Sequence, residues 1–491
     1  MKGVYQTLFK HSAIYGVGQI LSRLASFLLL PIYTNYLRPA DYGVIAILDL
    51  FGGVLGILIG AGMASAVNRY YFDAHTEAER NQVWWTGLTF LFVGGVIILS
   101  SGMLIRESLA QVTLGVNVKS GAFYFAFVLP TLWFNTCENL LSGYLRIRKW
   151  SAIYVGFSLV RLLLNIGINL YFLMVLQLGV TGILLGNLLV GGLATIVLLV
   201  VVAKNIGAYS FSPVLARQLW AFGSPLILMY LLSSFMHQAD RYFLRLYLDM
   251  SEVGVYSLGN TIGQAVNTLV LLPFSMIWNV VLYEVAQQPN AKQVYSQIFE
   301  YFFYGLSLLM LGVALFSEQL LPYLVAPDYM KAAEIIPIIC LAYLFFSLSE
   351  HFGVPVKLAK RTKMFIPVTL ASAATNLGCN MALIPWLGAI GAAWASVLTM
   401  AVYSFGGLWC YRRIEKYHYP LWSCGAVLIG LVSTYIVYKS LVIPKMETFW
   451  AMVIGCGIWL CWAIFLMRPL LRSMLIKKRE RDICGVKVNV G

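Results

Sequence analysis

Two arginines and an aspartate lie inside stretches long and apolar enough to cross a bilayer. Arg23 stands within residues 12–36 and Arg161 within residues 151–176. Each is about ten residues from one end of its stretch, or ~15 Å deep in a helix. An arginine at that depth costs about 3 kcal/mol or more unless it is paired or hydrated. Asp49 lies well inside the predicted span 42–65, so its carboxylate could neutralise one of the two arginines.

The guanidinium group indicates what such a site would bind. Its planar fork donates two hydrogen bonds at once to a phosphate. One interpretation is therefore a cationic cavity floor for an anionic ligand. The other is an internal ion pair in which Asp49 neutralises Arg23 or Arg161.

Polar side chains recur at helical spacing along five apolar stretches, which puts each set on one helix face. Amides and hydroxyls at such positions commonly hydrogen-bond a neighbouring helix. Five polar faces exceed what packing needs, so we expect a hydrated central cavity between two helical units. Besides the two arginines, the candidate residues on these faces are Asn165, His237, Asp240, Arg241, Asn260 and Asn376.

Several of these positions have a competing structural interpretation. A lone histidine such as His237 is more often a packing residue than a proton carrier. Asp240 and Arg241 adjoin near the end of their span, where a local ion pair and a gating role are both open. The glycines from Gly52 to Gly56 predict close helix packing.

Motifs for other chemistries are missing from the sequence. It contains no H-E-x-x-H, no G-x-S-x-G and no phosphate-binding glycine loop, so we expect no enzyme. The eight cysteines form no C-x-x-C pair, which indicates neither disulfides nor a metal site. The net charge of +14 resides in short loops and the tail, which favours membrane topology over nucleic-acid binding. No cofactor is expected, and a coupling ion, H⁺ or Na⁺, stays open.

Membrane helices must position these residues. The chain is 60% hydrophobic and 11% charged, whereas soluble domains carry about 25% charged residues. We predict an all-α, polytopic membrane protein with about 14 transmembrane helices. The predicted spans are 12–36, 42–65, 83–105, 121–142, 151–176, 179–203, 218–238, 253–282, 296–317, 332–355, 364–386, 389–410, 421–439 and 448–467.

Two blocks of the sequence recur at one offset of 211 residues. Tyr36-Leu37 matches Tyr247-Leu248, and the N-x-G-x-N motif at Asn165 matches that at Asn376. A shared offset indicates duplication, so we predict two parallel six-helix repeats related by an axis along the membrane normal. The expected divisions are residues 1–210, 211–416, two further helices in 417–468 and a basic cytoplasmic tail in 469–491.

The distribution of Lys and Arg predicts the orientation. With the N-terminus inside, about 24 of the 34 Lys and Arg residues fall in inner loops and tails. Cytoplasmic loops carry such an excess. We therefore expect both termini in the cytoplasm.

Three longer blocks carry a family resemblance: SAIYGVGQILSRLASFLLLPIYTNYLRPADYGV from Ser12, NRYYFD from Asn68, and DRYFLRLYL-x-x-x-EVGVYSL from Asp240. Together with the span count, they resemble the polysaccharide-transport branch of the MOP exporter superfamily, the Wzx-type flippases. The resemblance implies a bacterial inner-membrane flippase that moves undecaprenyl-pyrophosphate-linked oligosaccharides by alternating access. It serves the biosynthesis of O-antigen, capsule or exopolysaccharide.

The resemblance also implies site residues and partners. Charged residues of the lumen would handle the anionic lipid-linked sugar, with Arg69 of NRYYFD at the cytoplasmic mouth. The other positions that it implies are Arg23, Asp49, Arg161, Asp240 and Arg241. Implied partners are the lipid-linked oligosaccharide, membrane lipids, a polysaccharide polymerase and a chain-length regulator, with no nucleic acid.

Two other functions compete with this interpretation. A cation-coupled multidrug exporter would share the architecture, but such pumps favour acidic or apolar cavities, against which the mid-span arginines count. A membrane glycosyltransferase or polymerase would need a sizeable loop outside the membrane. The longest predicted connections, 66–82 and 204–217, are too short to form one.

Overall fold

A computed structural model of the chain describes residues 29–60, 62–116, 118, 120–414 and 419–485. Arg23 and most of the first predicted span lie outside the described residues. All regular structure among the described residues is helical, as the composition predicts. Ten of these helical stretches are long and apolar enough to cross a membrane.

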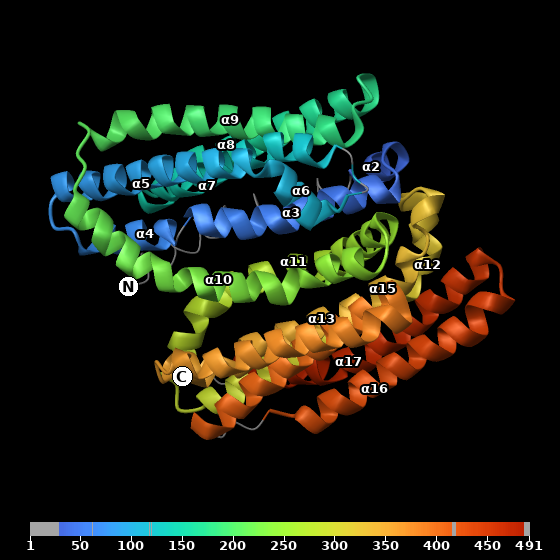
Figure 1. Ribbon diagram of the computed structural model, residues 1–491. Helices are drawn as coiled ribbons and strands as arrows, with labels where there is room; N and C mark the ends of the chain where they lie inside the picture. The colour runs from blue at the N-terminus through green and yellow to red at the C-terminus, as the bar shows by residue number, and fades with distance from the viewer. Residues whose placement is uncertain (1–28, 61, 117, 119, 415–418, 486–491) are drawn as a thin grey trace.

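The N-terminal half forms a bundle of helices with roughly parallel axes, which lies above α10 in Figure 1. Short breaks separate its helices, such as the one at Gly62, whose φ of +67° suits glycine. Its elements are α2 (Leu30–Tyr36), α3 (Pro39–Gly60), α4 (Met63–Asp73), α5 (Glu77–Leu104), α6 (Arg106–Leu114), α7 (Gly121–Ile147), α8 (Ser151–Leu170), the π-helical turn η1 (Tyr171–Val175) and α9 (Gly179–Ile206).

The C-terminal half forms the lower part of the molecule in Figure 1. Most of its buried apolar residues form one core cluster together with residues of α2, α3, α6, α7 and α9. Its elements are α10 (Pro213–Tyr247), α11 (Met250–Val285), α12 (Ala291–Leu324), η2 (Pro327–Tyr329), α13 (Ala332–Phe352), α14 (Val354–Leu358), η3 (Thr362–Met364), α15 (Phe365–Ile414), α16 (Leu421–Val437), η4 (Tyr438–Val442), η5 (Ile443–Lys445) and α17 (Thr448–Gly485).

Described helices cover the predicted spans from the second to the fourteenth. The predicted spans 364–386 and 389–410 are joined in α15, which is interrupted at Gly388, where φ is 60° and ψ is −136°. Helices α7 and α11 also cover predicted spans.

Polar side chains fix the starts of several helices. Thr76 and Glu79 form a reciprocal capping box at the start of α5, with Glu79 N 3.2 Å from Thr76 Oγ1. Asp249 caps α11 by accepting from Glu252 N at 2.9 Å. Both pairs satisfy backbone N–H groups that the first helical turn leaves without partners.

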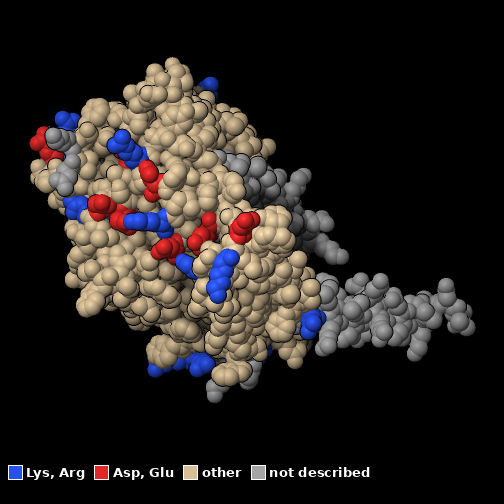
Figure 2. Space-filling view, turned by 90° about the vertical axis from the view of Figure 1, so that its right-hand side faces the viewer, with Lys and Arg blue, Asp and Glu red and all other residues tan. Residues whose placement is uncertain are grey.

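The two halves meet where α10 and α11 pack against α3 and α4, and again at the end of the molecule that holds α2 and the C-terminal end of α12. The Tyr329 hydroxyl donates to Leu37 O at 3.0 Å, and Ala326 N donates to Thr34 Oγ1 at 3.2 Å. Figure 2 looks onto this end and shows acidic and basic side chains side by side on a largely uncharged surface. One such pair joins Lys331 Nζ to a Glu252 oxygen at 3.3 Å.

Candidate functional site

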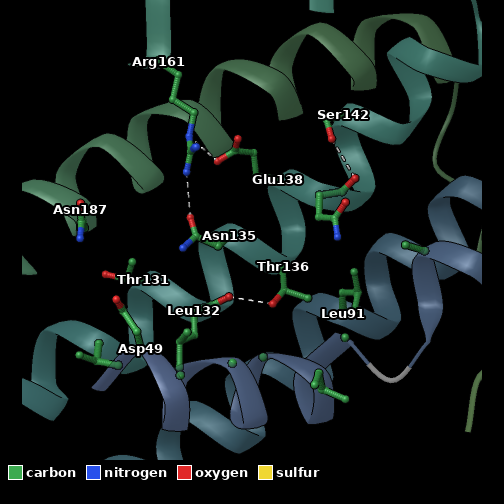
Figure 3. A pocket seen from close by; sticks show the side chains of 18 of the residues that line it. Asp49, Leu91, Thr131, Leu132, Asn135, Thr136, Glu138, Ser142, Arg161 and Asn187 are labelled. Atoms are coloured by element: carbon green, nitrogen blue, oxygen red, sulfur yellow. Dashed lines mark hydrogen bonds and ion pairs between the residues drawn. The ribbon is translucent and has the colours of Figure 1, made fainter. Parts of the chain in front are cut away.

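A cavity of about 1080 Å³ lies within the N-terminal half. Its walls come from α3, α4, α5, α7, α8 and α9, with Tyr230 of α10 at one side. Figure 3 shows side chains from these helices pointing into the same space. The polar and charged lining residues are Asp49, Ser65, Thr131, Asn135, Thr136, Glu138, Asn139, Ser142, Tyr154, Ser158, Arg161, Asn165, Asn187 and Tyr230.

Arg161 enters the cavity from α8 and is paired with α7. Its Nε lies 2.9 Å from Glu138 Oε2, and its Nη2 donates to Asn135 Oδ1 at 3.2 Å. The Arg161 side chain is 38% exposed and that of Glu138 is 13% exposed. Glu138 and Asn135 are three residues apart, so both face α8. The ion-pair partner is therefore Glu138 and not Asp49, which the sequence had suggested.

Asp49 lies on the other wall and points into the cavity from α3 (Figure 3). Its side chain is exposed there. Among the described residues it has no ion pair and no hydrogen bond. A carboxylate at mid-span that faces open space is available to a ligand.

The glycines of α3 widen the cavity beside Asp49. Gly52, Gly53, Gly56 and Gly60 all line it. A Cβ added to Gly56 would meet nothing within 4 Å, and one added to Gly53 would meet only Gln238, at 3.8 Å. The prediction of close helix packing at Gly53 and Gly56 is therefore wrong. Because these glycines have no side chains, the cavity extends up to the backbone of α3.

Three asparagines form a hydrogen-bonded set on α8 and α9. Asn165 Nδ2 donates to Asn187 Oδ1 at 3.0 Å, and Asn169 Nδ2 donates to Asn165 Oδ1 at 3.1 Å. Asn165 and Asn187 line the cavity. Sequence reasoning predicted Asn165 but missed Asn187. The signal was an amide inside the otherwise apolar span 179–203.

The matching residues in the C-terminal half are packed. Asn376 Nδ2 donates to Thr399 Oγ1 at 3.3 Å, and Asn380 Nδ2 donates to Asn376 Oδ1 at 3.0 Å. Asn376 is 1% exposed, and Asn380 and Thr399 are fully buried. Asn376 therefore joins α15 to itself across its break and does not line the described cavity.

Asp240 and Arg241 do not form a side-chain ion pair, because adjacent helical residues point in different directions. Asp240, 3% exposed, accepts from the Tyr256 hydroxyl and from Ser396 Oγ at 3.4 Å. Arg241 Nε donates instead to Ser257 Oγ at 3.3 Å. Both side chains tie α10 to helices of the C-terminal half.

The remaining predicted residues also lie away from the cavity. His237 Nδ1 lies 2.9 Å from Ser233 O, and its ring packs edge-on against Phe346. Asn260 is 4% exposed on α11. Arg69 is an exposed residue whose guanidinium lies 4.9 Å from the centre of the Phe222 ring. The described cavity thus brings together Asp49, Arg161 and Asn165 and lies inside one half of the molecule.

Metal chemistry finds no support in the described part of the chain. No group of three or more His, Cys, Asp or Glu residues there could hold a metal ion. The seven cysteines whose side chains are described are free thiols. The cavity offers carboxylate, guanidinium, amide and hydroxyl groups within a body of apolar helices that are long enough to cross a membrane.

Fold and cavity define a polytopic membrane transporter. The chain belongs to the polysaccharide biosynthesis protein family, whose model matches residues 8–278, more than half of its length. Protein 1 of the Lsg locus of Haemophilus influenzae is 23% identical over 264 residues, which are 53% of this chain and 62% of that protein. The chain thus matches about three fifths of the length of this curated relative.

Solved structures of the MOP superfamily share the fold. The lipid II flippase MurJ, in an inward closed conformation, aligns with 94% of this chain and 100% of its own, at a TM-score of 0.73 and 15% identity. A multidrug resistance transporter of the MATE family, in an inward-facing conformation, aligns with 80% of this chain and 97% of its own, at a TM-score of 0.65 and 16% identity. These likenesses place the chain in the fold of flippases and transporters.

Proposed function

We propose that this protein is a flippase for undecaprenyl-pyrophosphate-linked oligosaccharides in the bacterial inner membrane. It would supply the repeat units of a surface polysaccharide such as O-antigen, capsule or exopolysaccharide. The observation that carries the proposal is the 1080 Å³ cavity, lined by carboxylate, amide and hydroxyl groups within membrane helices. Membership of the polysaccharide biosynthesis family supports it.

The cavity provides hydrogen-bond partners for a polar headgroup inside the membrane. A sugar headgroup cannot cross hydrocarbon unaided, since each hydroxyl would lose its water without a replacement hydrogen bond. Asn135, Asn187 and Asp49 supply such partners at mid-depth. The polyprenyl chain is apolar and can stay in the surrounding lipid throughout. No bond of the substrate is made or broken, so the proposed activity is transport and not catalysis.

Alternating access requires that the cavity be closed toward one side at a time. The hydrogen bonds from Tyr329 to Leu37 and from Ala326 to Thr34 close the molecule at one end. The charge distribution predicts that this end is periplasmic. The conformation is then closed toward the periplasm, and rocking of the two halves would break these contacts on opening.

The test is transport in a defined system. The protein would be reconstituted in liposomes with a fluorescent undecaprenyl-pyrophosphate oligosaccharide, and its arrival in the outer leaflet read by an impermeant quencher. We expect transport that needs the protein and falls at least about tenfold in Arg161→Ala, because the change leaves Glu138 in the cavity wall without its counter-charge. An intact rate without the protein, or none with it under any ion gradient, contradicts the proposal.

A cation-coupled multidrug exporter is the second candidate. The specific observation in its favour is Asp49, an exposed carboxylate in the cavity that forms no hydrogen bond and no ion pair with the described residues. Such a site attracts organic cations. A dye-efflux measurement in cells that lack other pumps separates the two functions, because a flippase leaves dye accumulation unchanged.

Partners and energy source follow from the proposed function. A polymerase and a chain-length regulator would take the repeat units after translocation. A gradient of H⁺ or Na⁺ would drive the cycle, and imposing each gradient in turn across the liposomes identifies the ion.

A further inference from the structure

The described lining of the cavity contains more carboxylate than guanidinium. Asp49 and Glu138 are the acids and Arg161 is the base, with its Nε already 2.9 Å from Glu138. A phosphate binds best to a guanidinium whose N–H fork is free. Asp49 would repel a phosphate by charge. This set of residues therefore suits a neutral or cationic group better than the pyrophosphate.

Hydrogen-bonding capacity remains on both donors and acceptors. The Asn187 oxygen accepts from Asn165 at 3.0 Å and from Asn169 at 3.3 Å. Its amide NH₂ group has no partner among the described residues. The Asn135 oxygen is likewise used, by Arg161, which leaves that NH₂ group for the cavity. These NH₂ groups are donors and the Asp49 carboxylate is an acceptor, so together they suit sugar hydroxyls, which both donate and accept.

The two asparagine sets differ in what they face. In the C-terminal half, Asn376 and Asn380 are buried and hydrogen-bonded to each other and to Thr399. In the N-terminal half, Asn165 and Asn187 make similar bonds but open onto the cavity. If both sets served packing alone, we would expect the asparagines to be buried in both halves. The set of the N-terminal half faces the cavity instead, so its side chains can bind ligand groups there.

We propose that this cavity is a glycan subsite, an inference that rests on the flippase function proposed above. Asp49, Asn135 and Asn187 bind hydroxyl groups of the repeat unit, and the pyrophosphate lies outside this set. The subsite favours repeat units in which the sugar bound here is neutral or carries an amine. It disfavours units in which that sugar carries a carboxylate.

The test uses three synthetic probes in lipid nanodiscs. One is undecaprenyl pyrophosphate without sugar, one carries a disaccharide ending in glucose, and one carries the same disaccharide ending in glucuronic acid. Binding is followed by the quenching of tryptophan fluorescence. We expect the wild-type protein to bind the glucose probe about tenfold more tightly than the glucuronate probe, from like-charge repulsion.

Asp49→Asn should reduce this preference to about threefold or less, since the repelling charge is gone. Its affinity for the sugar-free probe should stay at the wild-type value. Glu447→Gln, which removes an exposed acid before α17, is the matched control and should keep the full preference. An unchanged preference in Asp49→Asn, or weaker binding of the sugar-free probe by that variant, overturns the subsite. Failure of the wild type to bind any of the three probes contradicts the flippase function itself.

Discussion

Gly43 and Gly254 lie against each other where α3 crosses α11. A Cβ added to either residue would come within 3.1 Å of the other's backbone nitrogen. It would also overlap a carbonyl oxygen, that of Met250 for Gly43 and that of Pro39 for Gly254. Gly43 and Gly254 are 211 residues apart in the sequence, and so are Pro39 and Met250. The contact is therefore reciprocal, as at a twofold axis. This geometry supports the proposed duplication.

The glycine crossing should be sensitive to a single methyl group. Gly254→Ala forces the backbones of α3 and α11 apart, and we expect it to destabilise this closed end by about 1–3 kcal/mol, the usual range for overpacking. The measurement is thiol labelling of Thr34→Cys, which is 2% exposed in the closed form. Labelling should speed up in the Gly254→Ala background. Gly378→Ala, where a Cβ meets nothing within 4 Å, should leave labelling unchanged.

The closed end should be a gate that must open. Ala326 N lies 3.2 Å from Thr34 Oγ1, and the residues 211 positions away, Gly115 and Arg245, also adjoin. We expect Thr34→Cys with Ala326→Cys to form a disulfide on oxidation and to stop transport, and a reductant to restore it. Transport that continues with the crosslink fully formed would show that this end does not open.

The ion pair between Arg161 and Glu138 should contribute to the stability of the folded protein. Glu138→Gln leaves the guanidinium without its counter-charge, and we expect a loss of about 1–2 kcal/mol of stability, moderated because Arg161 is partly exposed to the cavity. The double change Arg161→Gln with Glu138→Gln removes both charges and should regain part of that loss. Thermal unfolding in detergent compares Glu138→Gln, Arg161→Gln and the double variant. Additive losses would mean that the ion pair contributes nothing.

The two asparagine sets should respond differently to the same substitution. Asn376→Ala leaves the buried Asn380 and Thr399 short of a partner, so we expect a loss of about 1–3 kcal/mol of stability. Asn165 faces the cavity, so in Asn165→Ala water can replace the lost amide. It should cost less stability and should slow transport more. Melting temperature and initial transport rate, taken on the same samples, compare the pair.

The sequence alone determined the class of protein and its helices. Long apolar stretches and a scarcity of charge leave membrane helices as the structure that satisfies every backbone group in lipid. The capping signals at Thr76 and Asp249 are local, because a helix start is set by residues three positions apart. The polar faces were also visible, and Asp49, Arg161 and Asn165 were correctly placed inside spans.

Only the tertiary structure decided which polar faces meet. Glu138 reaches Arg161 because α7 packs beside α8, and a one-dimensional pattern carries no such neighbour relation. For the same reason, Asn376 and Asp240 looked like cavity residues but are buried against α15 and α11. Residue type fixes what a side chain can bind, whereas the packing of one helix against another fixes whether it faces a neighbour or an open space.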